Sequence, residues 1–268
     1  MPSLIRTRWH QGKRTTRFPA TPPELPARFR GRPQLDAARC LDGCRACVEA
    51  CPTGAVQTDP LRLDLGACVF CPACVEACPT GAITYTGDHQ LSASTRAALM
   101  LAGADAPAAP RVEALGRRMR QLFGRSLRLR QVSAGGCNGC EAELTALSNV
   151  VFDLSRFGIQ FVASPRHADG LVITGPVTRN MEYALRKTYE AVPAPKIVIA
   201  VGACAISGGP FAGACAVRDG VPSDILVDLY VAGCPPHPVT LLDGLLRLLG
   251  RIERAPGGNL QSEDPGSG

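Results

Sequence analysis

Short apolar runs alternate with helical periodicity through the second half of the chain. Three runs, "LRLRQVSAGGC", "KIVIAVGAC" and "VDLYVAGC", predict strands that end in glycine followed by cysteine, and "DGLVITGPV" predicts a further buried strand. Amphipathic helical periodicity appears in "EAELTALSNVVFDLSRFG", "NMEYALRKTYEAV" and "HPVTLLDGLLRLLGRI". Strands that alternate with helices predict a parallel sheet covered on both faces, and we assign this domain to residues 126–254.

One uncharged stretch, residues 197–217, is long enough to be mistaken for a membrane span. It contains five residues that would break a continuous helix: Gly202, Gly208, Gly209, Pro210 and Gly213. We therefore expect a buried strand that runs into a glycine-rich loop, in a soluble chain.

A repeat organises the first third of the sequence. "CVEACPTGAV" at 47–56 returns as "CVEACPTGAI" at 74–83, and each copy is too short to bury a core of its own. The second copy, "CVFCPACVEACP", has the C-x2-C-x2-C-x3-C-P spacing of bacterial two-cluster iron–sulfur proteins, in which the fourth cysteine of each run ligates the other cluster. Crossed ligation predicts one 4Fe–4S cluster on Cys51, Cys68, Cys71 and Cys74, and another on Cys40, Cys44, Cys47 and Cys78.

The first copy carries one extra residue between Cys40 and Cys44. This insertion means either a lost ligand or a wider loop in which Gly43 makes the turn, and we favour the loop because all the cysteines and Pro52 remain in order. A pair of zinc knuckles is the structural alternative for the repeat. Eight cysteines in this duplicated order, without a nearby histidine, fit two cubane clusters better.

Four more cysteines lie at the predicted strand ends. Because ligands collect beyond the carboxyl ends of parallel strands, Cys137, Cys140, Cys204 and Cys234 are expected to converge on one site. Four thiolates fit zinc or a third 4Fe–4S cluster, and we favour the cluster because an apolar α/β domain has little need of a structural zinc. Cys215 remains as a free thiol, expected to be buried. Glu141 and Glu143 are expected to stabilise a helix N-terminus, with a proton-relay role for Glu141 as the alternative.

Composition agrees with this picture. The 268 residues are 46% hydrophobic and 19% charged, which allows one or two packed domains. Thirteen cysteines, bunched at two- and three-residue gaps, indicate metal binding rather than a secreted disulfide framework, and "MPSLIRTRWH" has no apolar run typical of a signal peptide.

At this point a family resemblance becomes specific. "GCNGCEAE", "VGACAISGG" and "GCPP" resemble the small subunit of group 4, membrane-associated nickel–iron hydrogenases, including formate hydrogenlyase, over residues 126–252. The related complex I 20 kDa subunit has adjacent first cysteines, whereas Asn138 and Gly139 separate them here. Residues 28–90 resemble the two-cluster ferredoxin-type subunit of the same complexes. The resemblance implies a flavodoxin-like α/β domain with the proximal cluster, preceded by a small α+β ferredoxin-like domain over residues 35–90.

The resemblance also implies a function as an electron-transfer subunit with three 4Fe–4S clusters and no catalytic residue of its own. The expected partners are a nickel–iron large subunit, membrane-embedded complex I-like subunits, and a formate dehydrogenase or another electron donor. The expected location is cytoplasmic, on the inner face of the cell membrane through these partners. Two alternatives stay open: a subunit of a quinone or ion-pumping complex without nickel, and a non-catalytic redox sensor.

Two basic segments flank the ferredoxin-like region. Residues 1–34 hold eight Lys or Arg against Glu24, a net charge of +7, compared with +6 for the whole chain. Residues 91–125 are expected to be a linker that ends in a basic amphipathic helix, whose apolar face would carry Val112, Leu115, Met119, Leu122 and Phe123. Such a helix lies on a membrane or a partner, or is simply solvated. Nucleic-acid binding is not expected, because the basic helix has few aromatic residues and no recognition motif. Residues 255–268 are expected to be a disordered tail.

Overall fold

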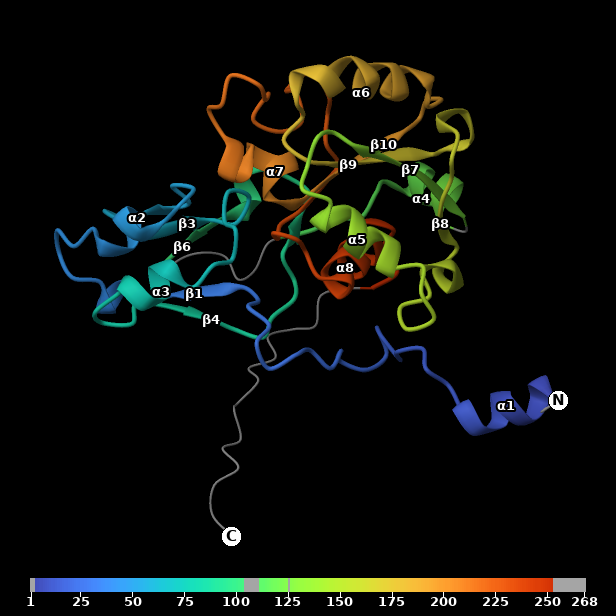
Figure 1. The fold of residues 1–268 in the computed structure, drawn as a ribbon, viewed down its shortest axis with the longest axis horizontal. Helices are drawn as coiled ribbons and strands as arrows, with labels where there is room; N and C mark the ends of the chain where they lie inside the picture. Colours follow the sequence, from blue (N-terminus) through green and yellow to red (C-terminus); the bar gives the residue numbers. More distant parts are fainter. Residues whose placement is uncertain (1–2, 104–110, 125, 253–268) are drawn as a thin grey trace, which may run out of the picture.

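The computed structural model describes residues 3–103, 111–124 and 126–252, which form two units that lie side by side (Figure 1). The smaller unit contains the two cysteine repeats, and the larger unit contains the main sheet. The predicted tail at 255–268 and residues 104–110 of the predicted linker lie outside the described residues.

The larger unit is built on a six-stranded sheet of order β5-β11-β10-β9-β7-β8. In this order the strands span Ser92–Ala93, Leu229–Val231, Ile197–Val201, Gly170–Thr174, Leu127–Ser133 and Ile159–Phe161. Strands β7 to β11 are mutually parallel, as the alternating pattern predicted, and β5 pairs antiparallel with β11 at one edge. Every residue of β9 and β10 is buried, as expected for strands covered on both faces.

Helices cover both faces of this sheet (Figure 1). α6 (Arg179–Ala191) lies on one face, where Leu185 packs in a cluster with Leu171 and Ile173. α5 (Gly139–Ala146) and α8 (Pro238–Leu248) lie on the other, where the leucines of α8 share a core with Leu127, Leu129 and Leu229. The apolar face of each helix is thereby removed from water, which is the main source of stability for helices of this length.

The smaller unit is organised by its repeat. Each "ACVEA" copy forms one short helix, α2 (Ala46–Ala50) and α3 (Ala73–Ala77). β1 (Pro33–Leu35) pairs antiparallel with β4 (Ile83–Tyr85). A three-stranded antiparallel sheet is formed by β2 (Val56–Gln57), β3 (Arg62–Asp64) and β6 (Met100–Ala102). Short 3-10 helices elsewhere in the chain span Ala37–Arg39, Ala97–Leu99, Leu154–Phe157, Pro165–His167 and Gly209–Phe211.

The structure departs from the sequence prediction in two helices. The helix expected over 141–158 ends at Ala146, because the Asn149 side chain accepts hydrogen bonds from the backbone N–H groups of Val151 and Phe152 and holds a turn. After β10 the chain does not pass directly into a loop. It forms the short helix α7 (Gly202–Ser207), which carries Cys204 in its first turn.

The segment expected to be a linker takes part in both units. β5 joins the main sheet, and β6 returns to pair with β3 of the smaller unit, so residues 92–102 cross between the units and back. The apolar face of the basic helix is also occupied. α4 (Arg117–Phe123) buries Phe123, and Val112, Leu115 and Met119 pack on the main core, while Leu122 is exposed.

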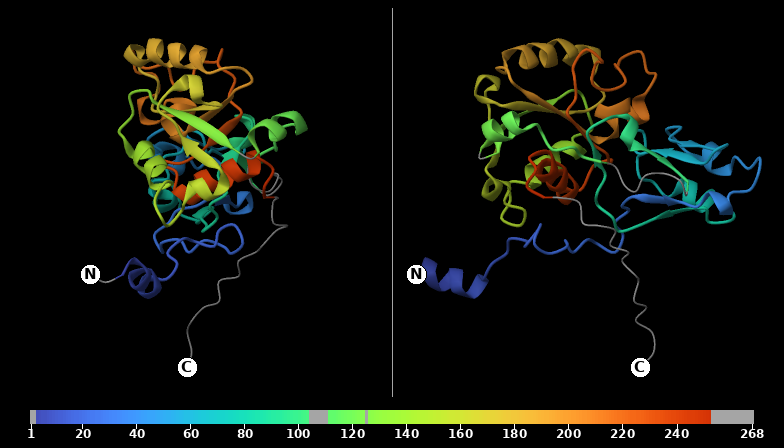
Figure 2. Two further views of the ribbon diagram at one scale, coloured as in Figure 1. Left: turned by 90° about the vertical axis from the view of Figure 1, so that its right-hand side faces the viewer. Right: turned by 180° about the vertical axis from the view of Figure 1, so that it is seen from behind.

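The basic N-terminal segment begins with a helix that stands away from both units. α1 (Leu4–Gln11) has no buried residue, and Figure 2 shows it apart from the body in two further views. In the described parts of the chain, no helix combines the length and apolar character needed to span a bilayer.

Candidate metal centres

Four cysteines meet beyond the carboxyl ends of the main sheet, and we call them the strand-end quartet: Cys137, Cys140, Cys204 and Cys234. Cys137 lies in the loop after β7, and Cys140 follows in the first turn of α5. Cys204 lies in α7 after β10, and Cys234 lies just after β11. The charges of the other three thiols all act on Cys140, so the structure brings the quartet together.

Glycine makes room for this quartet at one position. Gly202 has a φ of +86°, and a Cβ on it would lie 2.5 Å from Cys140 Sγ. A side chain at this position would therefore collide with the thiol and strain the backbone. The glycine of "VGAC" is the sequence signal that could have identified this close approach.

The electrostatics of the strand-end quartet favour a bound metal centre. Burial, reinforced by the charges of Glu141 and the neighbouring thiols, raises the pKa of Cys140 to about 12. Burial and the charge of Cys234 are the main causes that raise the pKa of Cys204 to about 11. Burial and the charge of Cys137 also raise the pKa of Cys234. These three thiols thus resist ionisation unless a cation compensates them, and metal coordination supplies that compensation. The donor set is purely thiolate, which suits an iron–sulfur cluster.

Glu141 lies in the first turn of α5, as predicted, and makes contacts that the sequence did not indicate. Its side chain is buried, and its Oε1 accepts hydrogen bonds from Ser133 Oγ and Thr174 Oγ1, both at 2.6 Å. Burial opposes ionisation, but these two hydrogen bonds lower the pKa of Glu141. The carboxylate ties the start of α5 to the ends of β7 and β9, directly beside Cys140. Sequence analysis missed Ser133 and Thr174, although both stand at the ends of predicted strands.

The inner quartet is the set Cys51, Cys68, Cys71 and Cys74. The charge of Cys51 contributes to the raised pKa of both Cys68 and Cys74. The structure therefore brings together residues of both repeats. Burial raises the pKa of Cys68 to about 12. The Tyr85 hydroxyl donates to the Cys71 carbonyl at 2.8 Å and lies 3.9 Å from Cys68 Sγ.

The outer quartet is the set Cys40, Cys44, Cys47 and Cys78. These four side chains line one hollow with Leu61 and Ile83. Cys40 reaches the group despite the extra residue before Cys44, and Gly43 has a φ of +71°, in the turn predicted for it. Burial, with the charges of Cys44 and Cys78, raises the pKa of Cys40.

The two repeats present their last cysteines in the same way. Ala55 N–H donates to Cys51 Sγ and Ala82 N–H donates to Cys78 Sγ, each at 3.2 Å. The hydroxyls of Thr53 and Thr80 lie 3.8 and 3.7 Å from the same sulfurs. Although burial opposes it, this hydrogen bonding lowers the pKa of both thiols. Hydrogen bonds to cluster sulfurs are one of the ways in which a protein tunes cluster potentials.

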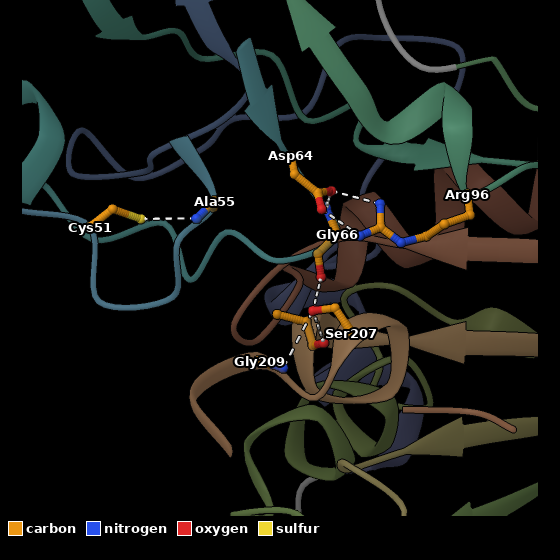
Figure 3. A network of polar contacts seen from close by, with 8 residues as sticks. Cys51, Ala55, Asp64, Gly66, Arg96, Ser207 and Gly209 are labelled. Atoms are coloured by element: carbon orange, nitrogen blue, oxygen red, sulfur yellow. Dashed lines mark hydrogen bonds and ion pairs between the residues drawn. The ribbon is translucent and has the colours of Figure 1, made fainter. Parts of the chain in front are cut away.

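The inner quartet adjoins the α/β unit through a polar contact (Figure 3). Ser207 Oγ, at the end of α7, donates to the Gly66 carbonyl at 2.9 Å. Gly66 N–H donates to Asp64 Oδ1 at 2.8 Å, and Arg96 forms an ion pair with the same Asp64 carboxylate. A Cβ on Gly66 would lie 2.7 Å from Ile206 Cγ2. A short path therefore links Cys204 to Cys68. Cys204 lies three residues before Ser207, the hydrogen bond joins Ser207 to Gly66, and Cys68 lies two residues after Gly66.

The thirteenth cysteine departs from its prediction. Cys215 is exposed, not buried as predicted, because the loop after the Gly209–Phe211 turn runs over the surface. Across the ranges that the structure describes, no three His, Cys, Asp or Glu side chains are grouped closely enough to hold a single metal ion.

One buried histidine lies away from the cysteines. His89 Nε2 is 3.9 Å from Asp243 Oδ1, and its ring packs edge-on against Phe18. Asp243 is in turn paired with Arg247 at 2.8 Å. Burial lowers the pKa of His89, while Asp243 and Asp88 oppose the shift and Arg247 adds to it. The neutral form of His89 is thus favoured in the folded protein.

The fold and its cysteines define an iron–sulfur protein in which a two-repeat unit adjoins an α/β domain. Residues 39–82 match the 4Fe–4S dicluster domain, and residues 137–248 match the family of the NADH ubiquinone oxidoreductase 20 Kd subunit. The "Probable membrane-bound hydrogenase subunit mbhJ" of Pyrococcus furiosus is 39% identical over 153 residues, which cover 56% of this chain and 92% of that protein. The chain therefore belongs to the family of the complex I 20 kDa subunit and the nickel–iron hydrogenase small subunit.

Two further relatives represent the two branches of the family. "Formate hydrogenlyase subunit 7" of Escherichia coli is 45% identical over 130 residues, 48% of this chain and 51% of that protein. An NADH-quinone oxidoreductase subunit of Heliobacterium modesticaldum is 46% identical over 121 residues, 45% of this chain and 69% of that protein. The chain thus spans about half the length of formate hydrogenlyase subunit 7. Family members are iron–sulfur subunits of oxidoreductases, as the sequence predicted.

Proposed function

We propose that this chain is the electron-transfer subunit of a membrane-associated nickel–iron hydrogenase complex of the formate hydrogenlyase type. The observation that carries the proposal is the strand-end quartet, four converging thiols on a domain 45% identical to a formate hydrogenlyase subunit. The nickel–iron centre would belong to a partner chain. The order of the five parallel strands, 2-1-3-4-5 in chain order, supports the flavodoxin-like description of that domain.

The three quartets would hold three 4Fe–4S clusters. When bound, each cluster accepts and donates one electron. The chain's own residues fix the order of the sites, since Gly66 and Ser207 join the inner quartet to α7 and hence to Cys204. The outer quartet, with half-exposed Cys40 and Cys44, would face the external electron donor. Electrons would then pass from the outer quartet through the inner quartet to the strand-end quartet, or in reverse.

The expected partners follow from the same reasoning. A nickel–iron large subunit would face the exposed Cys137 and Cys234, and membrane-embedded complex I-like subunits would place the chain at the cytoplasmic face of the membrane. A formate dehydrogenase or another donor would dock at the outer quartet. The names of the relatives, which include a membrane-bound hydrogenase, support this assembly.

The test is to isolate the native complex anaerobically and to measure nickel, hydrogen evolution and the iron of this chain. The proposal requires nickel, hydrogen evolution and about twelve irons per chain. About eight irons would remove one quartet from the proposal. A complex without nickel that reduces quinone would replace it with the second candidate, a complex I-related subunit, which the 46% identity to an NADH-quinone oxidoreductase subunit favours.

A further inference from the structure

Helix α1 presents large apolar side chains to solvent. Leu4 is 89% exposed, Ile5 is 79% exposed and Trp9 is 85% exposed. With 100° of rotation per residue, these three and Arg8 fall within about 140° of the helix circumference. They also line one hollow with Gly12 and Lys13. We call Leu4, Ile5 and Trp9 the α1 apolar face.

Basic residues lie both within and beside this face: Arg8 falls between Leu4 and Ile5, and Arg6 lies outside the arc that these residues span. Residues 3–23 contain Arg6, Arg8, Lys13, Arg14 and Arg17, and no Asp or Glu. A helix with Leu, Ile and Trp on one side and a surplus of basic residues has the chemistry of an interfacial helix, whose cations interact with anionic headgroups. A nucleic acid would account for the arginines, but not for the exposed aliphatic side chains.

The segment that follows α1 is anchored on the α/β unit. Thr16 N–H donates to the Val151 carbonyl at 2.9 Å, Arg156 donates to the carbonyls of Thr16 and Phe18, and the Phe18 side chain is buried. The four residues from Gly12 to Thr15 separate the helix from this anchor, so their reach is roughly 14 Å. Exposed Val150 lines a second hollow with Arg8, Arg14 and Asp153, where the two arginines outnumber the one carboxylate. The α1 apolar face and the loop around Val150 therefore lie on one side of the molecule.

We propose that α1 lies in the surface of an anionic lipid bilayer, with Leu4, Ile5 and Trp9 among the upper acyl chains and the basic residues at the phosphates. The short anchor then orients the α/β unit so that the loop around Val150 faces the membrane. The helix is short, so this contact is weak and adds to the attachment that partner subunits provide.

The chain carries its own reporter, because Trp9 is its single tryptophan. The intact iron-loaded chain is mixed with vesicles of phosphatidylglycerol and phosphatidylcholine, and separately with vesicles of phosphatidylcholine alone. We expect a blue shift of the Trp9 emission and co-sedimentation with the anionic vesicles, both strongly reduced when salt is raised to about 0.5 M. Neutral vesicles should give several-fold less binding.

The variants separate the two components of the contact. Leu4→Ser with Ile5→Ser should abolish the blue shift, and Arg6→Gln with Arg8→Gln should weaken binding and reduce its salt dependence. Leu226→Ser is the matched control, because Leu226 is 80% exposed but lies outside the basic N-terminal segment, residues 1–34. This variant should bind like the unmodified chain. Iron content verifies that each variant is loaded. Equal binding to neutral vesicles, an unchanged Trp9 emission with anionic ones, or protection of Trp9 by a purified partner subunit alone would each overturn the proposal.

Discussion

Gly66→Ala is the sharpest test of how the two units are held together. The added Cβ would lie 2.7 Å from Ile206 Cγ2, which is 0.7 Å short of the 3.4 Å at which ordinary contact begins. Ile206 is buried in the core that both units share, so it has little room to move. Overpacking of this kind costs roughly 1–3 kcal/mol, which corresponds to about a 5- to 150-fold increase in the separated population. The expected result is a looser contact between α7 and the inner quartet.

Hydrogen exchange measured by mass spectrometry reports this loosening directly. Peptides that cover residues 61–69 and 202–209 should exchange faster in Gly66→Ala, while those of β9 and β10 stay unchanged. Gly87→Ala is the matched control, since a Cβ there would meet no atom within 4 Å. Paramagnetic resonance of the reduced protein should also show a weaker magnetic interaction between the clusters of the inner and strand-end quartets. If Gly66→Ala exchanged no faster than Gly87→Ala, the contact would not be what aligns the units.

Three further predictions follow from the sites. Cys204→Ser and Cys234→Ser should each lose about four of about twelve irons and stop hydrogen evolution by the assembled complex. Cys215→Ser should keep its iron and its hydrogen evolution, and an equal loss in this variant would refute the strand-end quartet. Glu141→Gln removes a negative charge beside Cys140 but keeps an acceptor for Ser133. A redox titration should therefore give a higher potential for the cluster of the strand-end quartet. Glu190→Gln is the control, and a potential shift in Glu141→Gln no larger than in this control would contradict the prediction. The folded-state pKa of His89 is lowered, so the unfolded chain binds more protons below about pH 6.5 and stability falls from pH 7 towards pH 5. The unfolding midpoint of His89→Gln should fall less over this range. Midpoints of the two proteins that fall in parallel with pH would argue against the role of His89.

The cysteine spacing carried most of the site prediction. Fixed offsets along the chain are local, and the rule that ligands gather at the carboxyl ends of parallel strands then brought Cys137, Cys140, Cys204 and Cys234 to one place. The parallel sheet followed from β9 and β10, whose continuous apolar runs leave few alternatives.

The features that escaped prediction depend on tertiary contacts. The position of Glu141 in the first helical turn indicates a carboxylate near the helix dipole. Its hydrogen bonds with Ser133 and Thr174 depend on how the ends of two strands meet α5, which periodicity does not show. The end of α5 follows from one side chain, Asn149, within a stretch of helical periodicity. Strands of two or three residues, such as β5 and β6, carry no periodicity, so their pairing cannot be read from the sequence.

The joining of the two units is therefore more than a tether. A flexible linker raises the effective concentration of one domain near another but leaves their relative orientation free. Here the chain contributes β5 to the main sheet and then β6 to the small one, and Leu65 and Phe70 share a buried cluster with Ala205 and Ile206. The hydrogen bond from Ser207 to the Gly66 carbonyl is directional, so it helps to fix the orientation of the two units, which apolar packing alone specifies less well. Because electron transfer slows steeply with distance, a fixed contact between α7 and the inner quartet serves the proposed function better than proximity alone, and it explains why a glycine with no space for a side chain stands two residues before Cys68.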